Sequence, residues 1–197
     1  MLALMASSLT APAGPRPLPS DEQLAQGVQA GARDDLAALV TRHHSPLLGF
    51  LYRLTGGDRP LAEDLVQEVF LRVLRSIGQY HPARPFKPWL YAVAVNAARD
   101  HYKRAETRRT QALPPDYDAP GEPSPLAAVT AAETWAQVAA AVRALPEPQR
   151  EVLLLRYSED LSLAEIAEVL AIPVGTVKSR LSVALGRLRA HLAAEED

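Results

Sequence analysis

Apolar residues recur at helical spacing along two stretches of the chain, and the alternation that marks a β-strand is nearly absent. The first stretch predicts three helices, over residues 36–51, 60–77 and about 89–108. Gly56–Asp58 separates the first two helices, and a proline-rich loop at 82–88 precedes the third. The pattern therefore predicts an all-helical first module.

The middle helix of this module has two contrasting faces. Pro60 suits its first turn, where the backbone N–H groups have no partner within the helix. The apolar face, which we expect to be buried, contains Val66, Phe70, Val73, Leu74 and Ile77. The opposite face is polar and carries Asp64, Gln67, Glu68, Arg72 and Arg75.

The second stretch predicts three or four shorter helices. Pro146 and Pro148 end one helix and begin the next. Ser162 and Glu165 have the spacing of a capping box, and a tight turn at 171–175 precedes the last helix. That last helix is expected to bury Val177, Leu181, Ala184, Leu185 and Leu188.

Residues 110–126 separate the two stretches and contain five prolines, one glycine and three acidic residues. No helix or strand is expected to run through them, so they predict a linker. We therefore expect an all-α chain of two small helical domains, 21–109 and 127–193, joined by a flexible linker, the second a helix-turn-helix domain. Residues 1–20 are apolar but broken by four prolines, and we expect a disordered N-terminal extension there.

Basic residues gather in two patches, although the formal net charge is only −2. From Arg84 to Arg109 there are seven basic and two acidic residues, a local charge of +5, and the Lys, Arg, Asp and Glu residues at 173–192 are all basic. Because screening makes the local field matter more than the total, both patches suit phosphate groups. On charge alone, two solvated helix faces would explain the same pattern.

The turn at 171–175 and the helices that flank it have the dimensions of a helix-turn-helix. In this motif the first turns of the second helix face base edges in the major groove of DNA. Lys178, Ser179 and Ser182 lie on that face, and Arg180 suits a backbone phosphate. An ordinary helical hairpin with a hydrated basic face is the alternative interpretation of this pattern.

The composition argues against several other classes of protein. The chain has no cysteine, which excludes disulfides, a thiol nucleophile and the usual ligands of structural zinc. Its five histidines have no metal-ligand spacing, and no phosphate-binding loop or nucleophile elbow is present, so we expect no enzyme, no metal and no cofactor. No apolar run approaches the ~20 residues of a membrane span, and we expect no membrane insertion and a cytoplasmic location.

Four sequence motifs resemble the bacterial RNA polymerase sigma factors of the sigma-70 family. "LSLAEIAEVL" (161–170) and "GTVKSRL" (175–181) are similar to the promoter-recognising region 4 of that family. "AEDLVQEVFLRV" (62–73) and "FKPWLYAVAVNAARDHYKR" (86–104) are similar to region 2. The two regions occur in the family's order with no room for a separate region 3, which resembles the extracytoplasmic-function (ECF) group.

The resemblance implies an alternative sigma factor, which binds core RNA polymerase, recognises the −35 and −10 promoter elements and helps to open the DNA. It implies polymerase docking by Asp64, Gln67, Glu68 and Arg72. It implies −10 DNA binding by Asn96, Arg99, Lys103, Arg104 and Arg108, with the Asn96 amide on a base turned out of the stack. It implies −35 DNA binding by Thr176, Lys178, Ser179, Arg180, Ser182 and Val183. An anti-sigma factor is a further implied partner, and we expect a monomer.

Two positions depart from the family pattern. Val183 stands where an arginine is usual, so −35 recognition is expected to be weaker or to differ in sequence. Ala171 stands where glycine is common, which would strain the turn if its φ were positive. Two alternatives stay open: a helix-turn-helix transcriptional regulator that uses only the second module, and a degenerate sigma homologue that no longer opens promoters.

Overall fold

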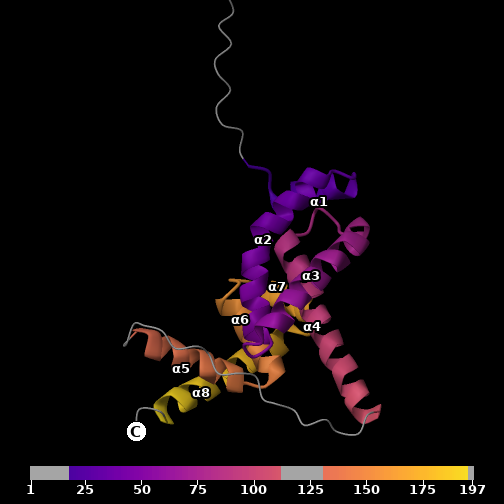
Figure 1. The fold of residues 1–197 in the computed structure, drawn as a ribbon. Helices are drawn as coiled ribbons and strands as arrows, with labels where there is room; N and C mark the ends of the chain where they lie inside the picture. Colours follow the sequence, from indigo (N-terminus) through magenta and orange to yellow (C-terminus); the bar gives the residue numbers. More distant parts are fainter. Residues whose placement is uncertain (1–17, 112–130, 195–197) are drawn as a thin grey trace, which may run out of the picture.

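The computed structural model describes the backbone of residues 18–111 and 131–194, and the side chains of 18–107 and 136–193. Most of the predicted linker and of the predicted extension at 1–20 therefore lies outside the described residues. The described parts are helical (Figure 1), which confirms the predicted fold class. The elements are α1 (Asp21–Gln29), α2 (Arg33–Leu54), α3 (Arg59–Ser76), η1 (Ile77–Gln79), α4 (Phe86–Gln111), α5 (Ala131–Ala144), α6 (Glu147–Tyr157), α7 (Leu163–Leu170) and α8 (Val174–Ala194).

The helices form two modules that pack on each other. In the first module α2 packs on α1 and α3, and α4 packs on α3. In the second module α8 packs on α5, α6 and α7. Contacts of α4 with α7, and of α2 with α5 and α6, join the modules. The C-terminal part of α4 projects away from this body (Figure 1).

The helix ends follow signals that the sequence carries. The Asp58 side chain accepts the N–H of Leu61 at 3.0 Å and caps α3. The predicted capping box of Ser162 and Glu165 is present at the start of α7. Gly56 adopts a φ of +76° at the end of α2, a left-handed conformation that glycine adopts without strain.

Helix α1 is the element that the periodicity analysis missed. Its nine residues are too few for a repeating stripe, but Ser20 and Gln23 form a capping box that the sequence also shows. The Glu22 carboxylate accepts the N–H of Phe86 at 3.1 Å, which lowers the pKa of Glu22. This bond caps α4, which begins at Phe86 and not near Trp89 as predicted. Pro88 consequently lies in the first turn of α4, where proline is tolerated.

The predicted buried face of α3 is wrong at one position. Val66, Val73 and Ile77 are buried as expected, but the Leu74 side chain is 44% exposed. Leu65 and Val69 face the core instead, so the buried stripe is rotated around the helix. Leu74 and Leu71, which is 47% exposed, are left on the outer surface.

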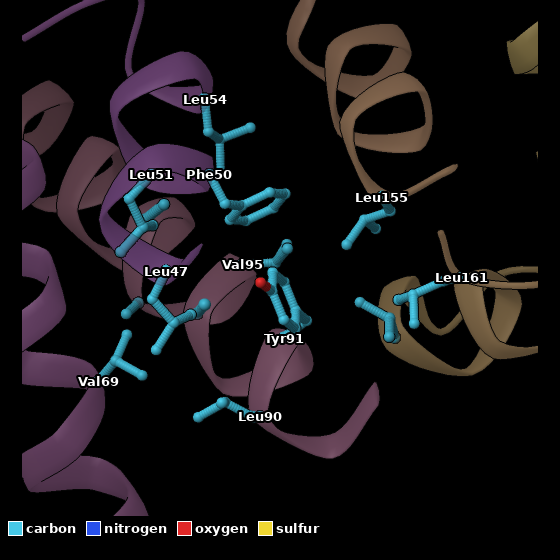
Figure 2. Packing of buried hydrophobic residues seen from close by; sticks show 14 of the residues in the cluster. Leu47, Phe50, Leu51, Leu54, Val69, Leu90, Tyr91, Val95, Leu155 and Leu161 are labelled. Atoms are coloured by element: carbon cyan, nitrogen blue, oxygen red, sulfur yellow. The ribbon is translucent and has the colours of Figure 1, made fainter. Parts of the chain in front are cut away.

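One apolar core runs through both modules. Figure 2 shows Phe50, Tyr91 and Val95 of the first module facing Leu155 and Leu161 of the second. The rings of Phe50 and Tyr91 meet edge to face with centroids 5.0 Å apart. The two predicted modules are present, and the structure adds that they are in contact.

Leu90, which is 0% exposed within this core, provides a test of the packing. We expect Leu90→Ala to lower the free energy of unfolding by roughly 2–5 kcal/mol, because it leaves a cavity. Leu71→Ala, on the exposed face of α3, should change it by less than about 0.5 kcal/mol. Urea unfolding followed by far-UV circular dichroism measures both. Equal losses would contradict this arrangement of the core.

Candidate nucleic-acid interface

The second module ends in a helix-turn-helix. Helices α7 and α8 meet at 102°, within the usual range of about 90–120° for this motif. Val177 and Leu181 are buried, and the opposite face of α8 is open to solvent. Its exposed side chains are Lys178, Ser179, Ser182 and Val183, with Thr176 and Arg180 half-buried beside them. The predicted −35 residues therefore lie on or beside a single accessible surface.

The turn between these helices contains a strained residue. Ala171 has a φ of +53° and a ψ of +46°, which is the left-handed region. A side chain in this conformation crowds the following carbonyl oxygen, whereas glycine does not. The strain expected at Ala171 is thus confirmed. The turn is held by the N–H of Ile172, which donates to the carbonyl of Ala167 at 3.0 Å.

Asn96 on α4 lies at a shallow hollow between α3 and α4. The hollow has a volume of about 320 Å³ and is lined by Arg72, Arg75, Ser76, Val93 and Asn96. Asn96 is exposed there, with its amide available for hydrogen bonds. A polar amide beside the exposed Arg75 can bind a base edge together with a neighbouring phosphate.

Arg99 and Asn96 have different surroundings, although their spacing predicted a shared face. The Arg99 guanidinium donates two hydrogen bonds to the Glu151 carboxylate of α6, at 2.8 and 2.7 Å. Lys103 and Arg104 are exposed on the projecting part of α4, and the Arg104 Nε donates to the carbonyl of Asp100 at 3.2 Å. The side chain of Arg108 lies outside the described residues.

The outer face of α3 combines polar and apolar groups. Asp64, Gln67, Leu71 and Leu74 are exposed at a spacing of three and four residues, so they share one face. Periodicity analysis assigned Leu74 to the core and therefore missed this exposed apolar pair. Both leucines continue the spacing of Asp64 and Gln67, which places the four residues on one face but does not show whether that face is buried.

Glu68 and Arg72 form a separate group beside this face. The Arg72 guanidinium donates to Glu68 at 2.7 Å and to Asp100 of α4 at 2.7 Å. These bonds raise the pKa of Arg72, and the hydrogen bond from Arg72 lowers the pKa of Glu68. Arg72 therefore joins α3 to α4, while Glu68 is half-buried.

Two carboxylates of the second module are buried at its contact with the first. Glu151 is 1% exposed and Glu159 is 5% exposed. Burial raises the pKa of Glu151, and the hydrogen bonds from Arg99 oppose part of that rise. Glu159 accepts a hydrogen bond from the Tyr91 hydroxyl, and burial with this bond raises the pKa of Tyr91. The hydrophobic pattern indicates neither group, although Glu151 directly precedes the apolar run 152–155.

Other kinds of site find little support in the described ranges. No cluster of three or more His, Cys, Asp or Glu residues there could hold a metal ion. No single helix in those ranges has the length and apolar character to cross a membrane. Only when the bent pair α7 and α8 is taken together do its length and composition suffice for a span. An apolar hollow of about 530 Å³ lies where the end of α2 meets α5, α6 and α8, and it also contacts Arg53, Arg143 and Arg189.

Both modules match sigma-70 family profiles, at residues 39–108 (Sigma-70 region 2) and 135–188 (Sigma-70, region 4). The chain is 35% identical over 175 residues to the RNA polymerase sigma-H factor of Pseudomonas aeruginosa, covering 82% of this chain and 88% of the relative. It is also 33% identical to the ECF RNA polymerase sigma factor SigW of Bacillus subtilis, covering 84% of this chain and 92% of the relative. The chain belongs to the ECF sigma factors of the sigma-70 family.

Two solved structures share the fold of this ECF sigma factor. CnrH, solved in complex with the cytosolic domain of CnrY, aligns with a TM-score of 0.67 at 28% identity, covering 88% of this chain and 97% of that one. RpoE of Bartonella quintana, solved with the anti-sigma factor NepR, aligns at 0.64 and 21% identity, covering 81% and 97%. This second likeness concerns the fold alone.

The strained turn of this sigma factor yields a stability prediction. We expect Ala171→Gly to raise the free energy of unfolding by about 1 kcal/mol, because it relieves the left-handed conformation. Ala37→Gly is the control, because Ala37 is a solvent-exposed residue in the interior of α2. Glycine there should lower the free energy of unfolding by roughly 0.5–1 kcal/mol. Thermal unfolding measures both, and a loss at position 171 would contradict the assigned conformation.

Proposed function

We propose that this ECF sigma factor joins core RNA polymerase through α3, binds the −10 element with α4 and binds the −35 element with α8. The observation that carries the proposal is the presence of three separate accessible faces on these helices. An isolated helix-turn-helix regulator would need only the face on α8. The test is run-off transcription with core polymerase on genomic fragments, followed by start-site mapping. If no genomic fragment supports initiation, the proposal is overturned and the degenerate homologue is favoured.

The exposed face of α3 is our candidate for polymerase docking. Leu71 and Leu74 add apolar area to the polar groups Asp64 and Gln67, and a mixed face of this kind suits a complementary helical surface. Glu68 and Arg72 also belong to the proposed docking region. Because they already bond to each other, we assign them to the edge of the contact, where Arg72 also holds α3 on α4 through Asp100.

The hollow at Asn96 is our candidate for capture of an unstacked −10 base. Unstacking a base costs a few kcal/mol, so a pocket and nearby cations are needed to trap the open strand. Lys103, Arg104 and Arg108 continue along α4 and would neutralise the phosphates that follow. Arg99 would join them once it is released from Glu151.

The open face of α8 is our candidate for −35 recognition. Lys178 suits guanine acceptors, Ser179 and Ser182 suit several bases, and Thr176 and Arg180 suit the backbone. Val183, 48% exposed, would meet a thymine methyl group where an arginine would have bound phosphate. Fewer phosphate contacts should make binding to this element less sensitive to salt.

We further propose an anti-sigma partner, a monomeric free state and a cytoplasmic location. CnrH was solved with the cytosolic domain of CnrY, which supports regulation by a protein partner. The apolar hollow that contacts Arg53, Arg143 and Arg189 suits an amphipathic segment with acidic flanks. Polymerase and promoter DNA, as the partners, fit the cytoplasm.

We expect Asn96→Ala to reduce promoter opening about tenfold or more while leaving polymerase binding within about twofold, because only the base contact is lost. Permanganate footprinting measures opening, and co-elution with core polymerase measures binding. Gln79→Ala, which removes an exposed amide in η1 that does not line the hollow, is the matched control. Loss of polymerase binding with Asn96→Ala would contradict the role assigned to this residue.

We expect the double variant Asp64→Ala, Gln67→Ala to weaken core polymerase binding about tenfold, because both side chains leave the docking face. Its affinity for −35 duplex DNA should not change, since that face lies on α8. Fluorescence anisotropy measures both affinities. Glu63→Ala is the control, because Glu63 is exposed one position away and pairs with Arg59 on the same helix. Equal effects of the two substitutions would contradict the assigned face.

A further inference from the structure

The two modules are in direct contact, but the proposed function needs them far apart. The names of the two promoter elements place them roughly 25 base pairs apart, which is about 85 Å along a duplex at ~3.4 Å per base pair. Helix α7, which leads into the −35 face, packs directly on α4, which carries the −10 face. Packed helix axes are only about 8–10 Å apart. The state described by this structure is therefore closed, and it has to open before both elements can be bound.

Glu151 faces the contact between the modules. It lies one helical turn before Leu155, and Figure 2 shows Leu155 directed toward Phe50 and Tyr91 of the first module. Both Glu151 oxygens accept hydrogen bonds from Arg99, which is one of the proposed phosphate-binding groups. In the closed state this guanidinium is occupied by a carboxylate in a geometry that a phosphate would also satisfy.

Glu159 forms a second connection between the modules. Its carboxylate accepts a hydrogen bond from Tyr91, lies 3.7 Å from the Lys87 ammonium and lies 3.6 Å from the Arg53 guanidinium. The Lys87 ammonium also donates to the backbone carbonyl of Glu159 at 2.6 Å. These three partners belong to the first module, so opening would break every one of these contacts.

We propose that Glu151 and Glu159 form an interdomain latch, which holds the free sigma factor closed and withholds Arg99 from promoter DNA. Core polymerase or promoter phosphate opens the latch by binding the separated modules. This inference rests on the proposed function, because it assigns a regulation to the same DNA-binding groups. Apolar contacts around Tyr91 and Leu155 supply most of the adhesion, and the carboxylates set the alignment, since desolvation offsets much of what a buried ion pair contributes.

The chain offers a convenient way to measure closure in the free protein. It has no cysteine, so two engineered cysteines can be labelled without side reactions. A side chain added at Gly78 in the first module, or at Gly186 in the second, would meet no atom within 4 Å. Energy transfer between dyes on Gly78→Cys and Gly186→Cys therefore reports the separation of the modules in full-length protein without polymerase or DNA.

We expect Glu151→Lys to lower the transfer efficiency by about half or more, because it places a lysine against Arg99. Apparent affinity for core polymerase should rise about tenfold, since a larger fraction of the protein is already open. Glu147→Lys makes the same charge change one turn earlier, at the exposed start of α6, and should leave both values within about twofold because Glu147 is not one of the hydrogen-bond partners of Arg99. Circular dichroism checks that both variants remain helical.

A charge exchange identifies the pair itself. Adding Arg99→Glu to Glu151→Lys should restore high energy transfer, because the ion pair is rebuilt in the opposite sense. Lys87→Met gives a milder test that leaves both carboxylates in place, and it should lower transfer in the same direction. Low energy transfer in the labelled protein with native Glu151 and Lys87 would overturn the latch. Unchanged energy transfer in both Glu151→Lys and Lys87→Met would also overturn it.

Failure of the latch and failure of the proposed function are distinguishable. Energy transfer requires neither polymerase nor DNA, so the latch can fail while the labelled protein still initiates transcription. Conversely, the latch can be present in a protein that initiates at no promoter, in which case the proposed function is wrong. If Glu151→Lys opens the protein but polymerase affinity does not change, closure does not regulate docking, and the inference is overturned.

Discussion

The contact between α4 and the second module is the constraint on which the rest of this structure depends. The first half of α4 is buried on several sides at once, with Tyr91 and Val95 in the shared core. Burying Glu151 beside this helix costs desolvation energy, and the bidentate pair with Arg99 offsets part of that cost. Because the same helix carries the proposed −10 face, packing and function compete for neighbouring positions on one element.

The direction of each α4 side chain around the helix decides whether it packs on a neighbouring helix or lies at the proposed DNA-binding face. Asn96 points toward the hollow beside α3, Arg99 bonds to α6, and Asp100 pairs with Arg72 of α3. A helix advances about 100° per residue, so residues three apart differ by about 60° in direction. Arg99 therefore reaches α6, whereas Asp100, four positions after Asn96, still meets α3. Residues at i, i+3 and i+7 share a broad face, yet a second module packed on one edge of that face separates them in function. From His101 to Thr107 the described side chains are exposed, and they include the cationic Lys103 and Arg104.

Sequence patterns predicted the local structure well, because caps and stripes are local signals. The break at Gly56, the capping box of Ser162 and the strained conformation of Ala171 all depend on nearest neighbours along the chain, and all are present. Leu74 was misassigned because a leucine at helical spacing has the same pattern whether it meets the core or a partner protein. The Arg99–Glu151 pair joins positions 52 residues apart, and periodicity carries no information about such a contact. The proposed roles of the site residues came from the family resemblance, and the structure supplies their exposure and neighbours.

Arg150 shows why a contact built this way can open. Its guanidinium donates to the carbonyl of Leu54 at the end of α2, and to the carbonyls of Arg143 and Leu145 within its own module. Burial lowers the pKa of Arg150, so the closed state carries a desolvation cost here as it does at Glu151. When the modules separate, water can replace the bond to Leu54, and the bonds within the second module remain. An entirely apolar contact would lose its adhesion without any such replacement. Polar groups that water can satisfy thus lower the cost of opening, and they still select a single alignment when the modules close.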